Sequence, residues 1–395
     1  MRVLTYYANL KSYRDRVMML RRASESLEHI HLIVGSGEAS EVDALQTERF
    51  TIDVAAPRMR GRALLQLAAF NAVSEAQSRF DFDLIHDTQG FLIPVLLAQR
   101  ALRLRRLRAP SPVLLTSSFL AANEWYDDVR KQHPYRPLWY QRLRLQTLLE
   151  ERIAVRLSDA ATVFGEGYIE PFAAFHHIEP ARVFSVPNCA DNERFFPEPP
   201  RPAVHGFEAD ARLLLFVGNV FRYKGIFELL TAFAALRPDH PKLRLLVVGP
   251  MHDEERAPIA EVRRRLNLSD DLVRFVGRVE RDDLRALYNT ASVFVLPSYF
   301  EGSPRVVIEA MACGSSIVTT DGHGTRTLDP KGSFIRFVPR ADADSLRDAV
   351  DAQLREPADM TRARMQAARE RYLSGHTPDA AAAALVSLYR RLVPT

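Results

Sequence analysis

The chain has few cysteines and no long apolar segment, and these absences exclude several classes of protein. Its 395 residues include only two cysteines, Cys189 and Cys313, which are too few for a disulfide framework. Neither has the spacing of a metal ligand. We predict no metal site and no cofactor. No apolar run reaches the ~18 residues that cross a bilayer, and the N-terminal residues lack a signal-peptide core. We therefore expect a cytoplasmic protein.

The chain also lacks a strong overall charge, although its charge is unevenly distributed. The formal net charge is +4, and the 47% hydrophobic content is typical of globular proteins. Between Arg100 and Arg144, however, there are ten Lys and Arg residues and only three acidic ones. Two interpretations remain open for this stretch: a solvated helix face, or a surface that contacts an anionic membrane or an acidic acceptor. No nucleic-acid-binding module is recognisable, so we predict no nucleic-acid partner.

Strand-like and helix-like segments alternate along the whole chain, which predicts an α/β fold with parallel sheets covered on both faces. At this length, two domains of roughly 150–200 residues are expected. The predicted strands of the first half are Val3–Tyr7, Ile30–Gly35, Phe50–Ala55, Asp83–His86, Val113–Ser117, Ala161–Phe164 and Val183–Val186. Those of the second half are Arg212–Val217, Leu243–Val248, Val273–Val276, Ser292–Leu296, Ser316–Thr320 and Ile335–Val338.

Helices are expected between these strands, and a proline-rich stretch separates the two halves. The predicted helices are Gly61–Arg79, Phe91–Arg106, Leu138–Leu157, Ile226–Leu236, Arg256–Leu266, Asp282–Asn289, Arg305–Cys313, Asp344–Leu354 and Pro378–Leu392. The prolines at 197, 199, 200 and 202 indicate an interdomain linker over residues 191–210. The simplest architecture is two doubly wound domains, residues 1–190 and 211–375, that face each other across a cleft.

The most informative segment, Ser292–Gly314, predicts a strand that leads into a helix. The apolar run Val293–Leu296 is typical of a buried strand. Ser303 is well placed as an N-cap, with Pro304 as the first helical residue, and Gly314 ends the helix.

Two glutamates, eight residues apart, lie on either side of this junction. Glu301 falls in the loop after the strand, and Glu309 falls about one and a half turns into the helix. In an open α/β sheet, ligands bind at the carboxyl ends of the strands, where free N–H groups at a helix start attract anions. Two carboxylates beside such an anion site favour a ligand rich in hydroxyls and phosphate, and a nucleotide sugar is such a ligand.

Basic residues follow another strand of the second half. The strand before Gly218 and Asn219 is followed by a loop with Arg222 and Lys224, which lead into a helix. Cations at a helix start oppose the helix dipole, so an anionic partner such as a diphosphate would explain them. Ordinary exposed loop charges are the alternative.

Two further strand ends carry glycines. Gly277 would let a flat base approach the backbone beside Arg278, although a plain tight turn explains the same residues. In Thr319–Thr327, His323 is either simply exposed or reaches the phosphates.

These motifs, in this order and spacing, resemble those of the retaining glycosyltransferases of family 4, the glycosyl transferases group 1. The matching blocks are FVGNVFRYKGIFELLTAF, LRLLVVGP and the stretch from VRFVGRV to SIVTTDG. The segment VFSVPNCADNERFFP is similar to the interdomain segment of the family. The resemblance implies the GT-B fold, with two Rossmann-like domains facing a cleft. The first domain would bind the acceptor, the second would bind the donor, and residues 376–395 would cross back to the first domain.

The resemblance also implies roles for individual residues. Glu301 matches the glutamate beside the donor sugar, and Glu309 the one that accepts hydrogen bonds from the nucleotide ribose. Lys224 matches the lysine on the donor diphosphate, and Gly302 and Ser303 match the loop that approaches the transferred sugar. The expected reaction is transfer of a sugar from a nucleoside diphosphate sugar, without a metal and with retention of configuration.

The chain departs from the family pattern at several positions. Asn219 stands where an arginine is common, and Arg222 would supply the missing cation. Ser117 and Thr327 replace a histidine and a glutamate, and the first loop lacks its glycine pair. Two alternative functions therefore stay open: a catalytically silent subunit that binds nucleotide sugar, and an epimerase or phosphorylase on the same fold. The acceptor is unassigned among surface polysaccharide, glycolipid and small metabolite, and a lipid-linked acceptor would place the enzyme peripherally at the inner face of the membrane.

Overall fold

A computed structural model describes most of the chain, in two compact units. The described residues are 1–7, 10, 14–55, 62–88, 92–104, 112–116, 149–201 and 206–393. Among them, unit 1 comprises the residues up to Cys189 and those from Pro378 onward. Unit 2 comprises Ala190–Thr377.

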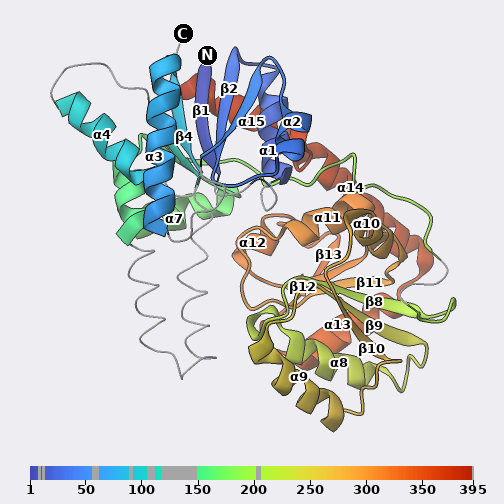
Figure 1. The fold of residues 1–395 in the computed structure, drawn as a ribbon. Coiled ribbons are helices and arrows are strands. Elements are labelled where there is room, and N and C mark those ends of the chain that lie inside the picture. Colours follow the sequence, from blue (N-terminus) through green and yellow to red (C-terminus); the bar gives the residue numbers. More distant parts are fainter. Residues whose placement is uncertain are drawn as a thin grey trace. The chain divides into compact units, whose positions relative to one another are not determined.

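Unit 1 is built on a parallel sheet whose strand order is β3-β2-β1-β4-β5-β6-β7 (Figure 1). Its strands are β1 Arg2–Tyr7, β2 His29–Val34, β3 Phe50–Val54, β4 Leu84–Asp87, β5 Val113–Thr116, β6 Ala160–Val163 and β7 Val183–Ser185. Its helices are α1 Arg14–Ser24, α2 Ala39–Leu45, α3 Arg62–Arg79, α4 Ile93–Leu104, α7 Ile169–His176 and α15 Pro378–Leu392, with short 3-10 turns η2 Glu166–Tyr168 and η3 Pro180–Arg182. Residues 149–157 are also helical.

Both faces of this sheet are covered because its strands are apolar on both sides. One face packs against α1, α2 and α15 in a single core cluster. The other packs against α3, α4, residues 154–155 and α7. The last helix, drawn red in Figure 1, lies against α1 and so belongs to unit 1, although the whole of unit 2 precedes it in the sequence.

Unit 2 has a six-stranded parallel sheet in the order β10-β9-β8-β11-β12-β13. Its strands are β8 Arg212–Val217, β9 Leu243–Val248, β10 Val273–Gly277, β11 Val293–Leu296, β12 Ile317–Thr320 and β13 Ile335–Val338. Its helices are η4 Arg222–Lys224, α8 Ile226–Leu236, α9 Asp253–Arg265, α10 Arg281–Thr290, α11 Arg305–Cys313, α12 His323–Arg326, α13 Ala343–Arg355 and α14 Ala358–Gly375. The helices surround the sheet (Figure 1), and one continuous apolar core joins the layers.

The residues predicted as a linker pack along unit 2 wherever the structure describes them. Phe195 is buried against Tyr288 of α10, with ring centroids 6.1 Å apart. Arg285 of α10 binds both Glu198 Oε2 at 3.1 Å and the carbonyl oxygen of Arg194 at 3.2 Å. This segment is therefore fastened to α10 by a ring contact and two polar contacts.

The sequence prediction of the α11 start is wrong by one residue. The helix begins at Arg305, and Pro304 rather than Ser303 occupies the N-cap position. The carbonyl oxygen of Pro304 accepts from the N–H groups of Val307 at 3.0 Å and Ile308 at 3.3 Å. Since a helix start needs no donor from its first residues, the missing N–H of proline has no cost there.

Candidate functional site

The site residues predicted from the sequence gather where the strand order of unit 2 reverses. From β8 the sheet continues to β9 and β10 on one side, while β11, β12 and β13 follow on the other. Such a reversal opens a crevice at the carboxyl ends of the two central strands, which is where open α/β sheets bind ligands. The loops at this point are residues 218–225 after β8 and residues 297–304 after β11.

Lys224 and Glu301 come from these two loops and form an ion pair. Lys224 Nζ donates to Glu301 Oε1 at 2.6 Å, and the two side chains are only 17% and 13% exposed. Burial alone would lower the pKa of Lys224, but attraction to the Glu301 charge and the hydrogen bond outweigh it, so that the pKa is raised. The lysine therefore stays cationic in a partly desolvated site.

Backbone contacts hold the two loops in register. The Tyr299 N–H donates to the carbonyl oxygen of Tyr223 at 2.8 Å, and Tyr299 Oη donates to Glu228 Oε1 at 2.6 Å. Gly225 has φ +71°, and a Cβ there would lie 2.1 Å from the carbonyl oxygen of Pro297. The lysine is thus followed by the one residue type that allows both the positive φ and this close approach.

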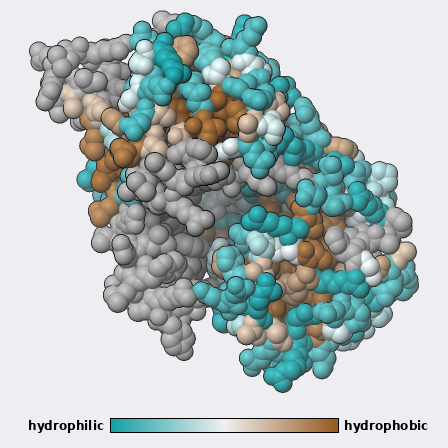
Figure 2. All heavy atoms as spheres, viewed as in Figure 1, coloured by the Kyte–Doolittle hydropathy of each residue, from teal (hydrophilic) through white to brown (hydrophobic). Residues whose placement is uncertain are grey.

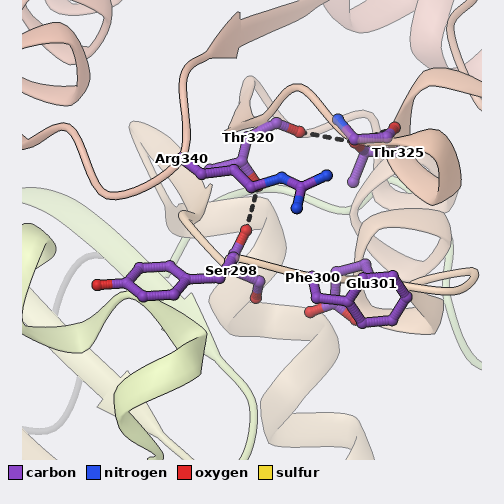
Figure 3. A pocket seen from close by; sticks show the side chains of 8 residues that line it. Ser298, Phe300, Glu301, Thr320, Thr325 and Arg340 are labelled. Atoms are coloured by element: carbon purple, nitrogen blue, oxygen red, sulfur yellow. Dashed lines mark hydrogen bonds between the residues drawn. The ribbon is translucent and has the colours of Figure 1, made fainter. Parts of the chain in front are cut away.

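The Glu301 loop also borders a small pocket (Figure 3). The pocket is lined by Ser298, Tyr299, Phe300, Glu301, Thr320, Gly322, Thr325 and Arg340. Thr320 Oγ1 donates to the carbonyl oxygen of Ser298, and Thr325 Oγ1 donates to that of Thr320 at 2.6 Å. The first bond joins the ends of β11 and β12, and the second joins the end of β12 to α12.

Glu309 lies deeper than Glu301 and has a different partner. It is 9% exposed, and its Oε2 accepts from the hydroxyl of Tyr288 at 3.0 Å. Tyr288, on α10, is 1% exposed. Burial and the neighbouring Glu309 charge raise the pKa of Tyr288 well above its usual value, so this phenol remains a donor. The sequence reasoning missed Tyr288 because no spacing rule links a residue of α10 to the second glutamate.

The remaining predicted residues differ in exposure. Arg222 is exposed, with its guanidinium 5.1 Å from the Phe227 ring centroid, and its backbone N–H donates to Glu255 Oε1 at 3.0 Å. Asn219 and Arg278 are exposed. The half-buried members of the predicted set are Gly218, Gly302 and Ser303.

Gly277 has φ +67°, and a Cβ there would meet nothing within 4 Å. This combination leaves open space over the backbone at the end of β10. It is compatible with the approach of a flat ring, as the sequence pattern predicted.

Some sequence predictions fall outside the described residues. These are the side chain of His323, Ser117, the loop that lacks its glycine pair, and nearly all of the basic stretch Arg100–Arg144. Thr327 is described, and its hydroxyl donates to the carbonyl oxygen of Gly324 at 2.9 Å.

Two searches of the described part of the chain gave negative results. No three His, Cys, Asp or Glu side chains within it come together as a set that could hold a metal ion. None of its helices is both long and apolar enough to cross a membrane.

The comparison with protein families identifies the segment that carries this site. Residues 199–371 match the family described as glycosyl transferases group 1. These residues therefore form a group 1 glycosyltransferase domain, and the family resemblance predicted from the motifs is confirmed.

Curated relatives match over part of their length. A D-inositol 3-phosphate glycosyltransferase from Kineococcus radiotolerans is 33% identical over 237 residues, which are 54% of this chain and 53% of the relative. One from Kribbella flavida is 31% identical over 63% of this chain and 60% of the relative. A putative teichuronic acid biosynthesis glycosyltransferase from Bacillus subtilis is 34% identical over 37% of this chain and 33% of the relative. The matches to the first two relatives thus cover little more than half of their length.

Solved structures match over nearly the whole chain. Sucrose-phosphate synthase from Thermosynechococcus elongatus has a TM-score of 0.76 and 22% identity, with 99% of both chains covered. Anabaena HepE, crystallised with UDP and glucose, has a TM-score of 0.72 and 16% identity, with 99% of this chain and all of HepE covered. At these identities the likeness concerns the fold, and it confirms the predicted GT-B fold of two Rossmann-like domains.

Proposed function

We propose that the protein is a glycosyltransferase that moves a sugar from a nucleoside diphosphate sugar to a hydroxyl acceptor, with retention and without a metal. The observation that carries the proposal is the buried Lys224–Glu301 pair, at the strand-order reversal of a group 1 glycosyltransferase domain. A cation and a carboxylate in contact there match the two parts of such a donor: an anionic diphosphate and a sugar that gains positive charge in the reaction.

Lys224 would act on the leaving group. As the bond between the sugar and the diphosphate breaks, negative charge grows on the phosphate oxygens. A preorganised cation in a site with little water stabilises this charge more strongly than one in bulk solvent. Arg222, in the same loop, would add a second cation, so this charge stabilisation would come from the protein itself.

Glu301 would act on the sugar. The transition state of glycosyl transfer is oxocarbenium-like, and an adjacent carboxylate favours the positive charge at the anomeric carbon. When the diphosphate engages Lys224, Glu301 loses part of its present partner and becomes available to the sugar. The acceptor hydroxyl would attack from the face that the diphosphate leaves and pass its proton to the departing diphosphate oxygen, which gives retention without a covalent enzyme intermediate.

Glu309 and the loops around it would hold the nucleoside. A buried carboxylate about one and a half turns into α11 is suited to accept hydrogen bonds from the ribose hydroxyls. Gly302 and Ser303 would contact the transferred sugar, and Gly218 and Asn219 the diphosphate. The open space over Gly277 and the exposed Arg278 would receive the base.

For the acceptor, we propose a lipid-linked or acidic molecule bound by unit 1. The support is the excess of basic residues in the sequence between Arg100 and Arg144, together with exposed apolar side chains on described helices of unit 1. Leu97 of α4 is 52% exposed, and Leu149 and Ile153 are 50% and 42% exposed. Exposed apolar residues near basic ones are typical of contact with an anionic lipid surface.

The test of the donor site is a thermal-shift panel with UDP, GDP, ADP and CMP, on wild type and Glu309→Ala. A ligand that binds only the folded state raises the melting temperature by mass action. We expect one diphosphate to stabilise the wild type but not the variant. If no nucleotide at millimolar concentration changes the melting temperature of the wild type, the proposed donor site is wrong.

Turnover then distinguishes transfer from the alternatives. With the donor that the panel identifies, transfer should continue in EDTA, and a loss of activity there would contradict the metal-independent mechanism. An isomerised donor in the absence of acceptor would indicate an epimerase. Binding without transfer or hydrolysis would indicate a silent subunit.

A further inference from the structure

The two glutamates of the site are held by partners of different kinds. Glu301 is paired with a charged lysine, which an incoming diphosphate would attract away. Glu309 accepts from a neutral, buried phenol, for which an anionic ligand has no comparable affinity. The bond to Glu309 can therefore persist in the ligand complex, whereas the bond to Glu301 is poised to change.

The Tyr288 side chain is itself fixed on several sides. Its ring makes edge contacts with Phe294 at a centroid distance of 5.4 Å and with Phe195 at 6.1 Å. Its carbonyl oxygen accepts from the Ser315 hydroxyl at 2.9 Å, and Ser315 follows directly on the glycine that ends α11. These contacts hold the ring and the backbone of Tyr288, and its hydroxyl donates to Glu309.

A fixed donor matters here because a glutamate side chain has three rotatable torsions. A carboxylate must be held within about 0.5 Å of its productive place for a ligand to use it fully. With Oε2 bound by Tyr288, the rotation of the Glu309 carboxylate is fixed, and its remaining acceptor positions keep one orientation.

We propose that Tyr288 is the positioning residue of the nucleoside site: its hydroxyl orients Glu309 so that this carboxylate accepts the ribose hydroxyls of the donor. The proposal rests on the proposed function, because it assigns a nucleotide to the same site. It adds a residue from α10 that no motif indicates, and it makes ribose selectivity depend on a hydrogen bond that does not touch the ligand.

The raised pKa of Tyr288 fits this role. Burial and the Glu309 charge both disfavour the phenolate, so the donor is present throughout the neutral and mildly alkaline range. The nearby Cys313 thiol likewise stays protonated, since burial and then the Glu309 charge raise its pKa to about 12. Neither neighbour therefore adds a second negative charge beside Glu309 near neutral pH.

The test compares ribonucleotides with nucleotides that lack the ribose hydroxyls. Dissociation constants are measured by calorimetry for UDP, GDP and ADP and for their 2′,3′-dideoxy forms. We expect wild type to prefer one ribonucleotide over its dideoxy form by at least tenfold. In Tyr288→Phe the dissociation constant of the ribonucleotide should rise by about tenfold, while that of the dideoxy form should stay unchanged. The preference for the ribonucleotide is then largely lost.

Tyr372→Phe is the matched control. Tyr372 is also fully buried in unit 2, and its hydroxyl donates to the carbonyl oxygen of Ala190 at 2.9 Å. This variant removes an equivalent hydrogen bond away from Glu309, so it should lose comparable stability and keep the full ribose preference. A purely structural role of Tyr288 would make the two variants behave alike.

The outcomes distinguish a failure of the positioning role of Tyr288 from a failure of the proposed donor site. If wild type binds none of the three ribonucleotides, the donor site itself is wrong. If wild type prefers the ribonucleotide and Tyr288→Phe keeps that preference, only the positioning role is overturned.

Should Tyr288→Phe fail to fold, the loss of the hydrogen bond from Tyr288 to the buried Glu309 carboxylate is the expected cause. The comparison is then made in a Glu309→Gln background, where position 309 carries no charge. Adding Tyr288→Phe should abolish whatever ribose preference Glu309→Gln retains, and a preference that survives the addition would overturn the positioning role.

Discussion

At the scale of single residues, Lys224 and Glu301 illustrate how a site can be ordered before its ligand arrives. Their ion pair at 2.6 Å holds both side chains in the crevice, although each would be costly to bury alone. A diphosphate offers Lys224 more negative charge than one carboxylate does. When the ligand binds, Lys224 can therefore exchange Glu301 for the diphosphate, and its positive charge keeps an anionic partner throughout.

The first prediction concerns this lysine. In Lys224→Ala, kcat/KM for the donor should fall about 10²–10³-fold, the usual loss when one preorganised stabilising group is removed from a transition state. The measurement is steady-state transfer with the nucleotide sugar of the base that the thermal-shift panel identifies.

Lys242→Ala is the control, because Lys242 is 65% exposed in an ion pair with Asp210 on the surface of the same unit. Surface pairs of this kind contribute little, so this variant should match wild type. Equal turnover by Lys224→Ala and wild type would refute the assignment of Lys224.

The sequence predicted Lys224, Glu301 and Glu309 because each stands at a fixed offset from a strand end or a helix start. It did not predict what holds them. Tyr288 precedes Glu309 by 21 residues on another helix, and only the packing of α10 on α11 brings the two together. Partners that depend on tertiary packing leave no periodic signal in the sequence.

At the scale of secondary structure elements, the strands were the easiest part to predict, and five of the described α-helices were missed: α1, α2, α7, α12 and α14. All thirteen described strands were predicted to within a residue or two, because buried parallel strands are short, apolar and rich in Val and Ile. The helix α1 was missed, since its Arg-rich ends hide the apolar run at 17–20, and α14 was missed because it buries only Ala368 and Tyr372. A surface helix such as α14 carries too weak an apolar stripe to predict.

The second prediction concerns the contact between α12 and the Glu301 loop. A Cβ on Gly324 would lie 2.2 Å from the carbonyl oxygen of Glu301 and 2.5 Å from that of Gly302. Gly324→Ala must therefore push this loop aside, and we expect it to lower donor affinity at least tenfold with the fold retained.

Gly322→Ala is the matched control in the same loop. A Cβ on Gly322 would come no nearer than 3.8 Å, to Thr325 Oγ1, which is ordinary contact. Calorimetric titration of the donor nucleotide should give wild-type affinity for this variant. Equal affinities for both alanine variants would show that the position of the Glu301 loop is unimportant for binding.

The third prediction concerns the junction between α15 and the sheet of unit 1. His86 of β4 is buried, and its Nδ1 lies 2.7 Å from the hydroxyl of Tyr389 on α15. Burial, with a smaller contribution from the Arg16 charge, lowers the pKa of His86 to about 3. The native state thus keeps this histidine neutral, while the unfolded chain binds a proton near pH 6.5.

Between pH 6.5 and about 3 the unfolded state therefore holds more protons at this site, so stability falls as the pH falls. The loss from His86 should be about 1.4 kcal/mol per pH unit well below pH 6.5. The measurement is the unfolding free energy from urea denaturation at pH 7, 6 and 5. His86→Asn, which keeps an acceptor near the position of Nδ1, should give a visibly shallower pH dependence. An unchanged slope in that variant would contradict the buried neutral histidine.

At the scale of the whole molecule, the two units carry different kinds of surface. The residues proposed for the nucleotide site all belong to unit 2, whereas most of the exposed large apolar side chains of the described residues belong to unit 1. Brown atoms are gathered on the part of unit 1 that carries α3 and α4 (Figure 2). Residues 149–157 combine exposed Leu149 and Ile153 with exposed Arg152 and Arg156. This division is what an enzyme needs if a water-soluble donor meets an acceptor held at a lipid surface.

The last prediction tests that division. Vesicles that contain anionic lipid should bind the wild type, and added salt should weaken the binding because it screens the attraction of Arg and Lys to the headgroups. The double substitution Leu149→Asp and Ile153→Asp removes two apolar contacts and adds two like charges, so partition to these vesicles should fall about tenfold or more.

The control for vesicle binding lies in unit 2. Met360 and Leu373 are 51% and 49% exposed on α14, so Met360→Asp with Leu373→Asp makes the same chemical change at the same exposure. If unit 1 meets the membrane, this second pair should bind vesicles nearly as wild type does. Equal losses in both double variants would mean that net charge alone governs the binding. Vesicle binding that does not depend on salt, or no vesicle binding, would contradict the proposal of a lipid-linked acceptor and favour a water-soluble one.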